Sequence, residues 1–273
     1  MKALILTEGG RKIGFGHITR CSALYEAFEK KGINPYLIVN GDNSVKAMLK
    51  GKRNKIFNWL KKQDELLDLI SGADAVILDS YLAKSGLYKK IAGRVKLAVY
   101  VDDNNRINYP KGVVINGSIY AKELDYPKRK DSVYLLGTKF LALRREFLKV
   151  RRKKIGKEIN TVMITFGGDD SKNMTPRVLN LLVAEFPQFT KKVMIGQSFN
   201  NVQQIIKVAD SRTELMYYSD SRKMRDCMRA ADIAVSAAGQ TLYELARSGV
   251  PTVAVAVAKN QLNNIIGWEM LAS

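Results

Sequence analysis

Near its N-terminus the chain reads Ala3-Leu4-Ile5-Leu6-Thr7 and, after a short gap, Gly14-Phe15-Gly16-His17-Ile18-Thr19-Arg20. The apolar run predicts a buried β-strand, and the glycines predict a loop that leads into a helix. The N-terminus of a helix presents unpaired N–H groups and a partial positive charge, and anions therefore bind there. This strand–loop–helix order is typical of parallel α/β sheets, whose ligands bind beyond the carboxyl ends of the strands.

His17 is the only histidine of the chain, and it stands where the loop is expected to become a helix. Imidazole is the side chain that most readily exchanges a proton near neutral pH. We therefore predict proton chemistry beside a phosphate or sugar oxygen. The alternative is a histidine that only caps the helix, but the glycines on either side favour the functional interpretation.

Apolar runs alternate with amphipathic stretches along the chain, which predicts buried parallel strands with helices on both faces. The predicted fold is α/β and GT-B-like, with two Rossmann-like, doubly wound parallel-sheet domains that face each other across a cleft. We place the domains at 1–150 and 158–273 and a basic linker at 151–157. The expected strands are 3–7, 35–40, 75–79, 96–102, 113–116, 133–136, 160–166, 192–195, 232–236 and 251–257, with helices near 18–28, 173–186, 221–230 and 240–248.

Composition limits the function classes. The chain has 45 Lys and Arg against 26 Asp and Glu, a net charge of +19, which permits nucleic acid, an anionic membrane or a polyanionic substrate as a partner. Because the basic residues are scattered and no aromatic platform for bases accompanies them, we rank solvated surface first, substrate steering or loose membrane attraction second, and nucleic acid third. No apolar run is long enough to span a bilayer, and Cys21 and Cys227 are far apart, so we expect a cytoplasmic protein.

Three loops of the second half follow expected strands. The first is Phe166-Gly167-Gly168-Asp169-Asp170-Ser171, where the glycines let backbone N–H groups approach an anion and Asp169 could accept a hydrogen bond from a sugar hydroxyl. The alternative is a tight turn in which Asp169 or Ser171 only caps the next helix. The second is Ser236-Ala237-Ala238-Gly239-Gln240-Thr241-Leu242-Tyr243-Glu244, which predicts a phosphate site with Glu244 directed toward a ribose. The alternative is an ordinary helix start in which Thr241 only caps the helix and Glu244 faces solvent. Lys259-Asn260-Gln261-Leu262-Asn263 carries amides that suit hydroxyl and acetamido groups.

Several common chemistries find little support in the sequence. The first loop lacks the dinucleotide fingerprint because Thr19 replaces its third glycine, and it lacks the Gly-Lys-Ser/Thr ending of a P-loop. One histidine and two distant cysteines do not make a zinc site, and no Gly-x-Ser-x-Gly segment supplies a serine nucleophile. The helical spacing of Cys21 indicates a core residue rather than a nucleophile.

Taken together and in order, the loops resemble the PseG family, the UDP-2,4-diacetamido-2,4,6-trideoxy-β-L-altropyranose hydrolases of pseudaminic acid biosynthesis. The resemblance covers nearly the whole chain, and the second-half loops are also similar to those of GT-B glycosyltransferases such as MurG. The matching motifs are Gly14-x-Gly16-His17-x-x-Arg20, Asp79-Ser80-Tyr81, Val101-Asp102-Asp103, Arg144-Arg145-Glu146-Phe147, Gly167-Gly168-Asp169, Ser236-Ala237-Ala238-Gly239-x-Thr241-x-x-Glu244 and Asn260-Gln261.

The resemblance implies a GT-B enzyme that removes UDP from the sugar with inversion and needs neither a metal nor another cofactor. By this resemblance, His17 is the residue expected to orient and deprotonate the attacking water. Tyr81 is expected to be a second catalytic residue, near the sugar. The remaining matching positions imply substrate contacts: Gly167, Gly168, Ser236, Ala237, Gly239 and Thr241 toward uridine and diphosphate, Glu244 toward the ribose, Asn260 and Gln261 toward diphosphate or sugar, with Gly14, Gly16, Arg20, Arg144 and Asp169 completing the set.

Two alternatives stay open at this point. An inverting GT-B glycosyltransferase would use the same base and UDP-sugar donor but pass the sugar to an acceptor, and a nucleotide- or RNA-binding module would bind without catalysis. The exact sugar and the oligomeric state are not encoded in a recognisable motif. The last helical pattern reaches Ser273, whereas GT-B proteins usually run further, so we expect a longer natural protein.

Overall fold

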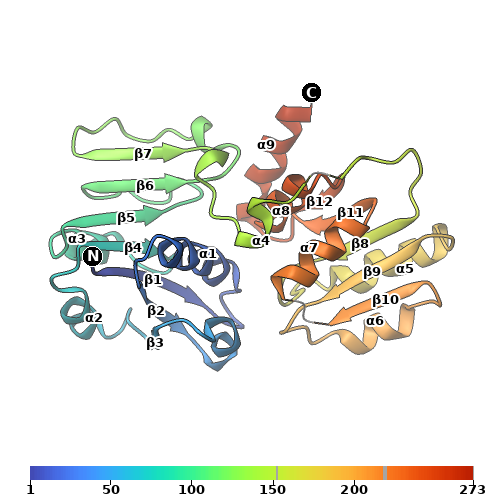
Figure 1. Cartoon of the computed structure of the whole chain (residues 1–273), viewed down its shortest axis with the longest axis horizontal. Helices are drawn as coiled ribbons and strands as arrows, with labels where there is room; N and C mark the ends of the chain where they lie inside the picture. Colours follow the sequence, from blue (N-terminus) through green and yellow to red (C-terminus); the bar gives the residue numbers. More distant parts are fainter. Residues whose placement is uncertain (152, 218–219, 273) are drawn as a thin grey trace. The chain divides into compact units, whose positions relative to one another are not determined.

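The computed structural model describes residues 1–151, 153–217 and 220–272. They form two compact units, Met1–Ala142 and Leu143–Ser273, and each contains one sheet flanked by helices (Figure 1). The cleft expected between the two domains stays a prediction. Arg152 of the expected linker and Ser273 at the end of the second domain lie outside the described residues.

The described residues of the first unit form a seven-stranded sheet in the order β3-β2-β1-β4-β5-β6-β7, and every pair of neighbouring strands is parallel. The strand order reverses between β1 and β4 (Figure 1). The strands are β1 (Ala3–Gly9), β2 (Tyr36–Gly41), β3 (Asn54–Ile56), β4 (Ala75–Asp79), β5 (Leu97–Val101), β6 (Gly112–Asn116) and β7 (Ser132–Leu136), and the helices are α1 (Gly16–Lys30), α2 (Gln63–Ile70), α3 (Ser85–Ala92) and the 3₁₀ turns η1 (Asn43–Leu49), η2 (Ala121–Glu123) and η3 (Thr138–Phe140).

Strand β1 contributes to two cores because successive side chains of a strand point to opposite faces. Leu4 and Leu6 pack with α2 and α3 on one face. On the other face Ile5 packs with Ile18 and Cys21 of α1, both of which are fully buried. This packing fixes the first turns of α1 against the sheet and thereby fixes the place of the residues at its start.

The described residues of the second unit form a five-stranded sheet in the order β10-β9-β8-β11-β12, again parallel throughout. Here the order reverses between β8 and β11. The strands are β8 (Thr161–Thr165), β9 (Thr190–Ile195), β10 (Thr213–Tyr217), β11 (Ile233–Ala237) and β12 (Thr252–Val255), and the helices are α4 (Arg145–Leu148), α5 (Met174–Glu185), α6 (Val202–Val208), α7 (Ser221–Ala230), α8 (Thr241–Ser248), α9 (Leu262–Ala272) and the 3₁₀ turn η4 (Lys259–Gln261).

The second unit also has a core on each face of its sheet. Val162 and Ile164 of β8 pack on the side of α5 and α6, while Met163 between them packs on the side of α7 and α8. Phe147 and Val150 belong to the latter core, which explains why the second unit begins at Leu143, before the linker expected at 151–157.

The expected strands and helices are present, with ends that differ by a few residues, but two strands and the helices α2, α3, α4 and α6 were missed. Both missed strands, β3 and β10, lie at sheet edges and are only partly buried, so they lack the continuous apolar run that marks a central strand. Cys21 and Cys227 are buried and unpaired, as expected. Within the described residues no helix is long and apolar enough to cross a membrane.

Candidate active site

The predicted functional residues of the first unit meet at the carboxyl ends of β1, β4 and β5, which are neighbours in the sheet. His17 and Arg20 lie on α1 after β1, Asp79 ends β4, Tyr81 follows it, and Asp103 follows β5. Parallel α/β sheets bind ligands where the strand order reverses, and here that point is the boundary between β1 and β4. The fold therefore brings three of the predicted residues together at the expected edge.

His17 lies in the first turn of α1 and is 8% exposed. Its Nδ1 is 2.7 Å from Oδ1 of Asp79, whose side chain is fully buried. Burial alone would raise the pKa of Asp79, but Arg20 and His17 hold that pKa well below its usual range. An ionised carboxylate can only accept, so this hydrogen bond requires a proton on Nδ1. In the neutral ring Nε2 is then the basic nitrogen, the arrangement that a general base requires.

Arg20 joins two carboxylates at the site. Its Nε and Nη2 each donate to Asp79 at 2.5 Å, and its Nη1 donates to Asp103 at 2.7 Å. Burial opposes the charge of Arg20, but Asp103 and Asp79 raise its pKa well above the ordinary value. Nη2 also lies 3.1 Å from Nδ1 of His17, but both atoms carry protons in the tautomer just described, so this contact is not a hydrogen bond. The substrate contact expected of Arg20 stays a prediction.

Tyr81 lies against the imidazole. Its ring centroid is 4.6 Å from that of His17 at an interplanar angle of 86°, an edge-to-face arrangement. Its hydroxyl donates to Oδ2 of Asp103 at 2.5 Å. One carboxylate, Asp103, therefore holds both Arg20 and Tyr81, and both of these residues lie next to the imidazole of His17.

The loop between β1 and α1 leaves space next to its backbone. Gly10 and Gly14 exchange backbone hydrogen bonds of 3.1 and 2.8 Å, which close the loop. Gly14 has a φ of +87°, which favours glycine. A Cβ on Gly14 or Gly16 would meet no atom within 4 Å. The backbone at the start of α1 is therefore open beside His17, as the predicted anion site requires.

In the second unit the predicted loops follow β8, β11 and β12, which are neighbours at one edge of the sheet. Gly167 has a φ of +79°, is exposed, and has no atom within 4 Å of the position of a Cβ. The carbonyl of Gly168 accepts from Ser198 N at 3.0 Å, so the loop after β9 supports it. Asp169 is half-buried.

The cap of α5 comes from a residue that the sequence analysis did not choose. Asp170, rather than Asp169 or Ser171, accepts from the backbone N–H groups of Met174 and Thr175 at 2.8 and 2.9 Å. It also accepts from Asn201 at 2.8 Å. Since Asp170 supplies the cap, the side chain of Asp169 is not needed for that purpose.

The loop after β11 lies beside the segment after β12. The amide of Asn264 donates to the carbonyl of Ala238 at 2.9 Å, and Nε2 of Gln261 is 3.7 Å from the place of a Cβ on Gly239. Oε1 of Gln261 accepts from Val257 N at 2.9 Å, which fixes its side chain. The structure thus brings Gln261 to the glycine of the predicted phosphate loop.

The other predicted members of this loop pair differ in exposure. Ser236 and Ala237 are buried, Thr241 is half-buried and Asn260 is exposed. The hydroxyl of Ser236 donates to the carbonyl of Ala237 at 3.1 Å. Their ligand contacts stay predictions, and the geometry leaves Thr241, Gly239 and Asn260 more accessible than Ser236.

Arg144 and Glu244, predicted as separate substrate contacts, form a bidentate ion pair. Nε of Arg144 donates to one carboxylate oxygen at 2.7 Å and Nη2 donates to the other at 2.6 Å. The side chain of Glu244 is 3% exposed and that of Arg144 is 20% exposed. Glu244 therefore does not face solvent, and any ribose contact would have to share an oxygen with Arg144.

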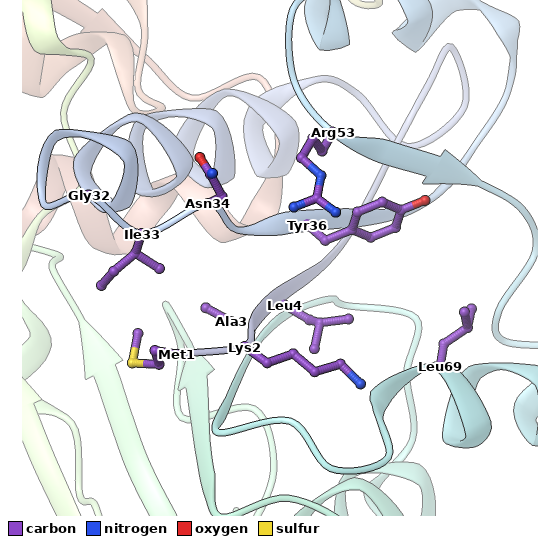
Figure 2. A pocket seen from close by; sticks show the side chains of 10 residues that line it. All are labelled: Met1, Lys2, Ala3, Leu4, Gly32, Ile33, Asn34, Tyr36, Arg53 and Leu69. Atoms are coloured by element: carbon purple, nitrogen blue, oxygen red, sulfur yellow. The ribbon is translucent and has the colours of Figure 1, made fainter.

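Within the described residues, neither a metal cluster nor the cavity at the amino ends of β1 and β2 coincides with these site residues. Among the described residues no group of three or more His, Cys, Asp or Glu side chains could hold a metal ion. One cavity of about 520 Å³ lies at the amino ends of β1 and β2, lined by Lys2, Leu4, Tyr36 and Arg53 among others (Figure 2). That is the edge of the sheet opposite His17, where α/β sheets do not usually bind substrates.

The sequence analysis missed Glu8 and the roles that Asp79 and Asp103 have at the histidine site. Glu8, Asp79 and Asp103 each stand at or just after the end of an apolar strand. A pattern could have found them, because acids at the carboxyl ends of neighbouring parallel strands must lie close together. The motifs that contain Asp79 and Asp103 were recognised, but the hydrogen bonds of these acids to His17, Arg20 and Tyr81 were not foreseen.

The chain resembles known proteins at low sequence identity. No protein-family model matches the chain. It is 26% identical over 266 residues to an uncharacterized protein of Methanocaldococcus jannaschii, a match that covers 93% of this chain and 55% of that protein. It is also 26% identical over 268 residues to the pseudaminic acid cytidylyltransferase and UDP-2,4-diacetamido-2,4,6-trideoxy-beta-L-altropyranose hydrolase of Helicobacter pylori, covering 96% of this chain and 46% of that protein. The chain thus spans about half the length of these relatives.

The fold has solved counterparts. The MurG structure of Acinetobacter baumannii superposes with a TM-score of 0.67 over 100% of this chain and 84% of that chain, at 14% sequence identity. The chain has a GT-B fold. At this identity the likeness concerns the fold alone.

Proposed function

We propose that the protein is a hydrolase of UDP-sugars that releases UDP with inversion, acting on UDP-2,4-diacetamido-2,4,6-trideoxy-β-L-altrose. The observation that carries the proposal is the hydrogen bond between Nδ1 of His17 and buried Asp79, which leaves Nε2 as the base. The relative from Helicobacter pylori, whose name includes this hydrolase, supports the choice of substrate.

In the proposed reaction Nε2 of His17 takes a proton from water as the water oxygen attacks the anomeric carbon. A new carbon–oxygen bond forms on one face while the bond to the β-phosphate oxygen breaks on the other, and UDP leaves with the bonding electrons. Asp79 stabilises the imidazolium that forms. The open loops of the second unit are proposed to hold the nucleotide through backbone N–H groups, which favour the charge that develops on UDP.

A glycosyltransferase is the alternative within the same fold. It would use His17 to deprotonate an acceptor hydroxyl instead of water. The small exposed fraction of the His17 side chain, 9%, and the ring of Tyr81 against it favour a nucleophile as small as water. We therefore prefer hydrolysis.

The decisive experiment supplies the UDP-sugar without an acceptor and follows UDP release. The proposal predicts one UDP and one free sugar per turnover, unchanged by EDTA. His17→Ala should lower turnover by about 10²- to 10⁴-fold while UDP binding stays nearly constant. No release without an acceptor would favour the transferase, and equal turnover of the variant and the wild type would remove His17 from the mechanism.

A further inference from the structure

The carboxyl end of β1 carries a buried carboxylate, Glu8, that the proposed mechanism does not use. Glu8 has no exposed surface. Its Oε1 accepts from the backbone N–H groups of Tyr81 and Leu82 at 2.6 and 3.1 Å, and its Oε2 accepts from the hydroxyl of Ser80. All three donors belong to the short turn after β4, so this side chain binds one consecutive segment.

The same turn is held from the other side by a guanidinium. Arg106 donates to the carbonyl of Ser80 at 2.9 Å and to that of Ala83 at 3.2 Å. The hydroxyl of Ser80 in turn accepts from Ala83 N at 2.9 Å. An anion therefore binds the N–H groups of the turn and a cation binds its carbonyl groups, which leaves its backbone little freedom.

The side chain carried by this turn is Tyr81. Glu8 fixes its backbone N–H, and Asp103 accepts from its hydroxyl at the other end of the side chain. The ring is thus held at both ends while its edge-to-face contact with His17 is kept at 4.6 Å. Asp79 restrains His17 through Nδ1, and the Tyr81 ring restrains the plane of the imidazole.

A purely structural explanation accounts poorly for this choice of residue. Burying a carboxylate is costly, and buried polar groups can often be replaced by apolar ones at little cost in stability. All of the hydrogen bonds of Glu8 given above go to the turn that carries Tyr81. A role in holding Tyr81 in place therefore explains this buried carboxylate better than stability alone.

We propose that Glu8 is a positioning residue for His17, acting through the Ser80–Leu82 turn and the ring of Tyr81. The kinetic part of this inference rests on the proposed function, and the spectroscopic part does not. His17 is the only histidine in the chain, so a histidine-labelled protein gives one set of imidazole signals. Nitrogen-15 NMR then reports the tautomer and mobility of this ring alone.

The test compares Glu8→Ala with Glu8→Gln in the full chain. Glutamine can keep the two backbone bonds through Oε1 and donate to the Ser80 hydroxyl, whereas alanine loses all three bonds. In Glu8→Ala we expect shifted or broadened His17 signals and kcat lowered by about 10- to 100-fold, the cost of a misplaced catalytic group, with KM nearly unchanged. Glu8→Gln should restore both the spectrum and most of kcat.

Asp232→Ala is the matched control. Asp232 also accepts from two consecutive backbone N–H groups, those of Asn160 and Thr161, both at 3.0 Å, but in the second unit. It should lower thermal stability without changing the His17 spectrum or kcat. If Glu8→Ala does not fold, Ser80→Ala decides, because it removes one bond of the turn and should shift the His17 signals in part.

The outcomes separate the two proposals. A folded Glu8→Ala, or in its place Ser80→Ala, with the wild-type His17 spectrum would overturn the positioning role. A wild-type protein that releases no UDP would overturn the proposed function, and the spectra of the variants would still decide the role of Glu8.

Discussion

At the scale of single residues, the site depends on which nitrogen of His17 carries the proton. Asp79 can only accept at 2.7 Å from Nδ1, and Arg20 keeps Asp79 ionised by occupying both of its oxygens. The tautomer is thus set by a residue that lies 62 positions away in the sequence. Residue types alone pointed to His17, but its partner became evident only when β1 and β4 paired, with Thr7 in register with Asp79.

Replacing Asp79 by asparagine tests this arrangement. In Asp79→Asn the amide can rotate its NH₂ group toward Nδ1, which would favour a proton on Nε2 and remove the base. We expect kcat to fall by about 10³- to 10⁴-fold, the scale known for such tautomer changes. Nitrogen-15 NMR of the single histidine should show the proton moved from Nδ1 to Nε2.

Asp68→Asn, on the exposed face of α2, serves as the control and should behave as the wild type. If Asp79→Asn keeps both the tautomer and the turnover of the wild type, Asp79 has no part in orienting the ring.

At the scale of elements, the loops after central strands were predictable and the side-chain pairs between them were not. The glycines of the loop before α1 predicted a helix start with accessible backbone, and a Cβ placed on Gly14 or Gly16 indeed has no atom within 4 Å. By contrast, the Arg144–Glu244 pair joins α8 to the chain before α4, which no local pattern encodes. The edge strands β3 and β10 were missed because half-buried strands carry no continuous apolar run.

Gly16→Ala separates the stability of α1 from ligand binding at its start. Gly16 is the first residue of the helix, its φ is not positive, and a Cβ there meets no atom within 4 Å. Alanine should therefore raise the free energy of unfolding by about 0.5–1 kcal/mol. If substrate approaches this backbone, KM should rise at the same time.

Gly86→Ala is the matched control for this variant. Gly86 lies in the first turn of α3 with equally open surroundings, and its replacement should stabilise the protein without changing KM. Urea unfolding and steady-state kinetics measure both quantities, and an unchanged KM in Gly16→Ala would show that substrate does not approach there.

Glu244 offers a second prediction at the level of elements, on α8. If its carboxylate accepts from the ribose, the wild type should prefer UDP over 2′-deoxy-UDP by about tenfold, the value of one hydrogen bond to a charged group. Glu244→Ala should bind UDP more weakly and lose this preference, while Glu269→Ala, at an exposed residue of α9, should keep it. Calorimetry of both nucleotides measures the difference. If Glu244→Ala still prefers UDP over 2′-deoxy-UDP, Glu244 does not contact the ribose and its role is limited to the ion pair with Arg144.

At the scale of the whole molecule, the α/β pattern was sufficient to predict two parallel sheets, and the GT-B fold follows from their superposition on a known structure. The first unit contains a histidine held by a buried acid, and the second unit contains a loop in which the backbone of Gly167 is open. The fold is shared by enzymes that transfer sugars, so the fate of the sugar must come from chemistry rather than from architecture.

Turnover of the UDP-sugar in ¹⁸O-water, without an acceptor and sampled before the free sugar exchanges its anomeric oxygen, tests the central claim most directly. Attack by water at the anomeric carbon predicts ¹⁸O in the released sugar, an inverted anomer, and UDP free of label, with the rate of label incorporation lowered by about 10²- to 10⁴-fold in His17→Ala. Label in the β-phosphate of UDP, or a retained anomer, would contradict it.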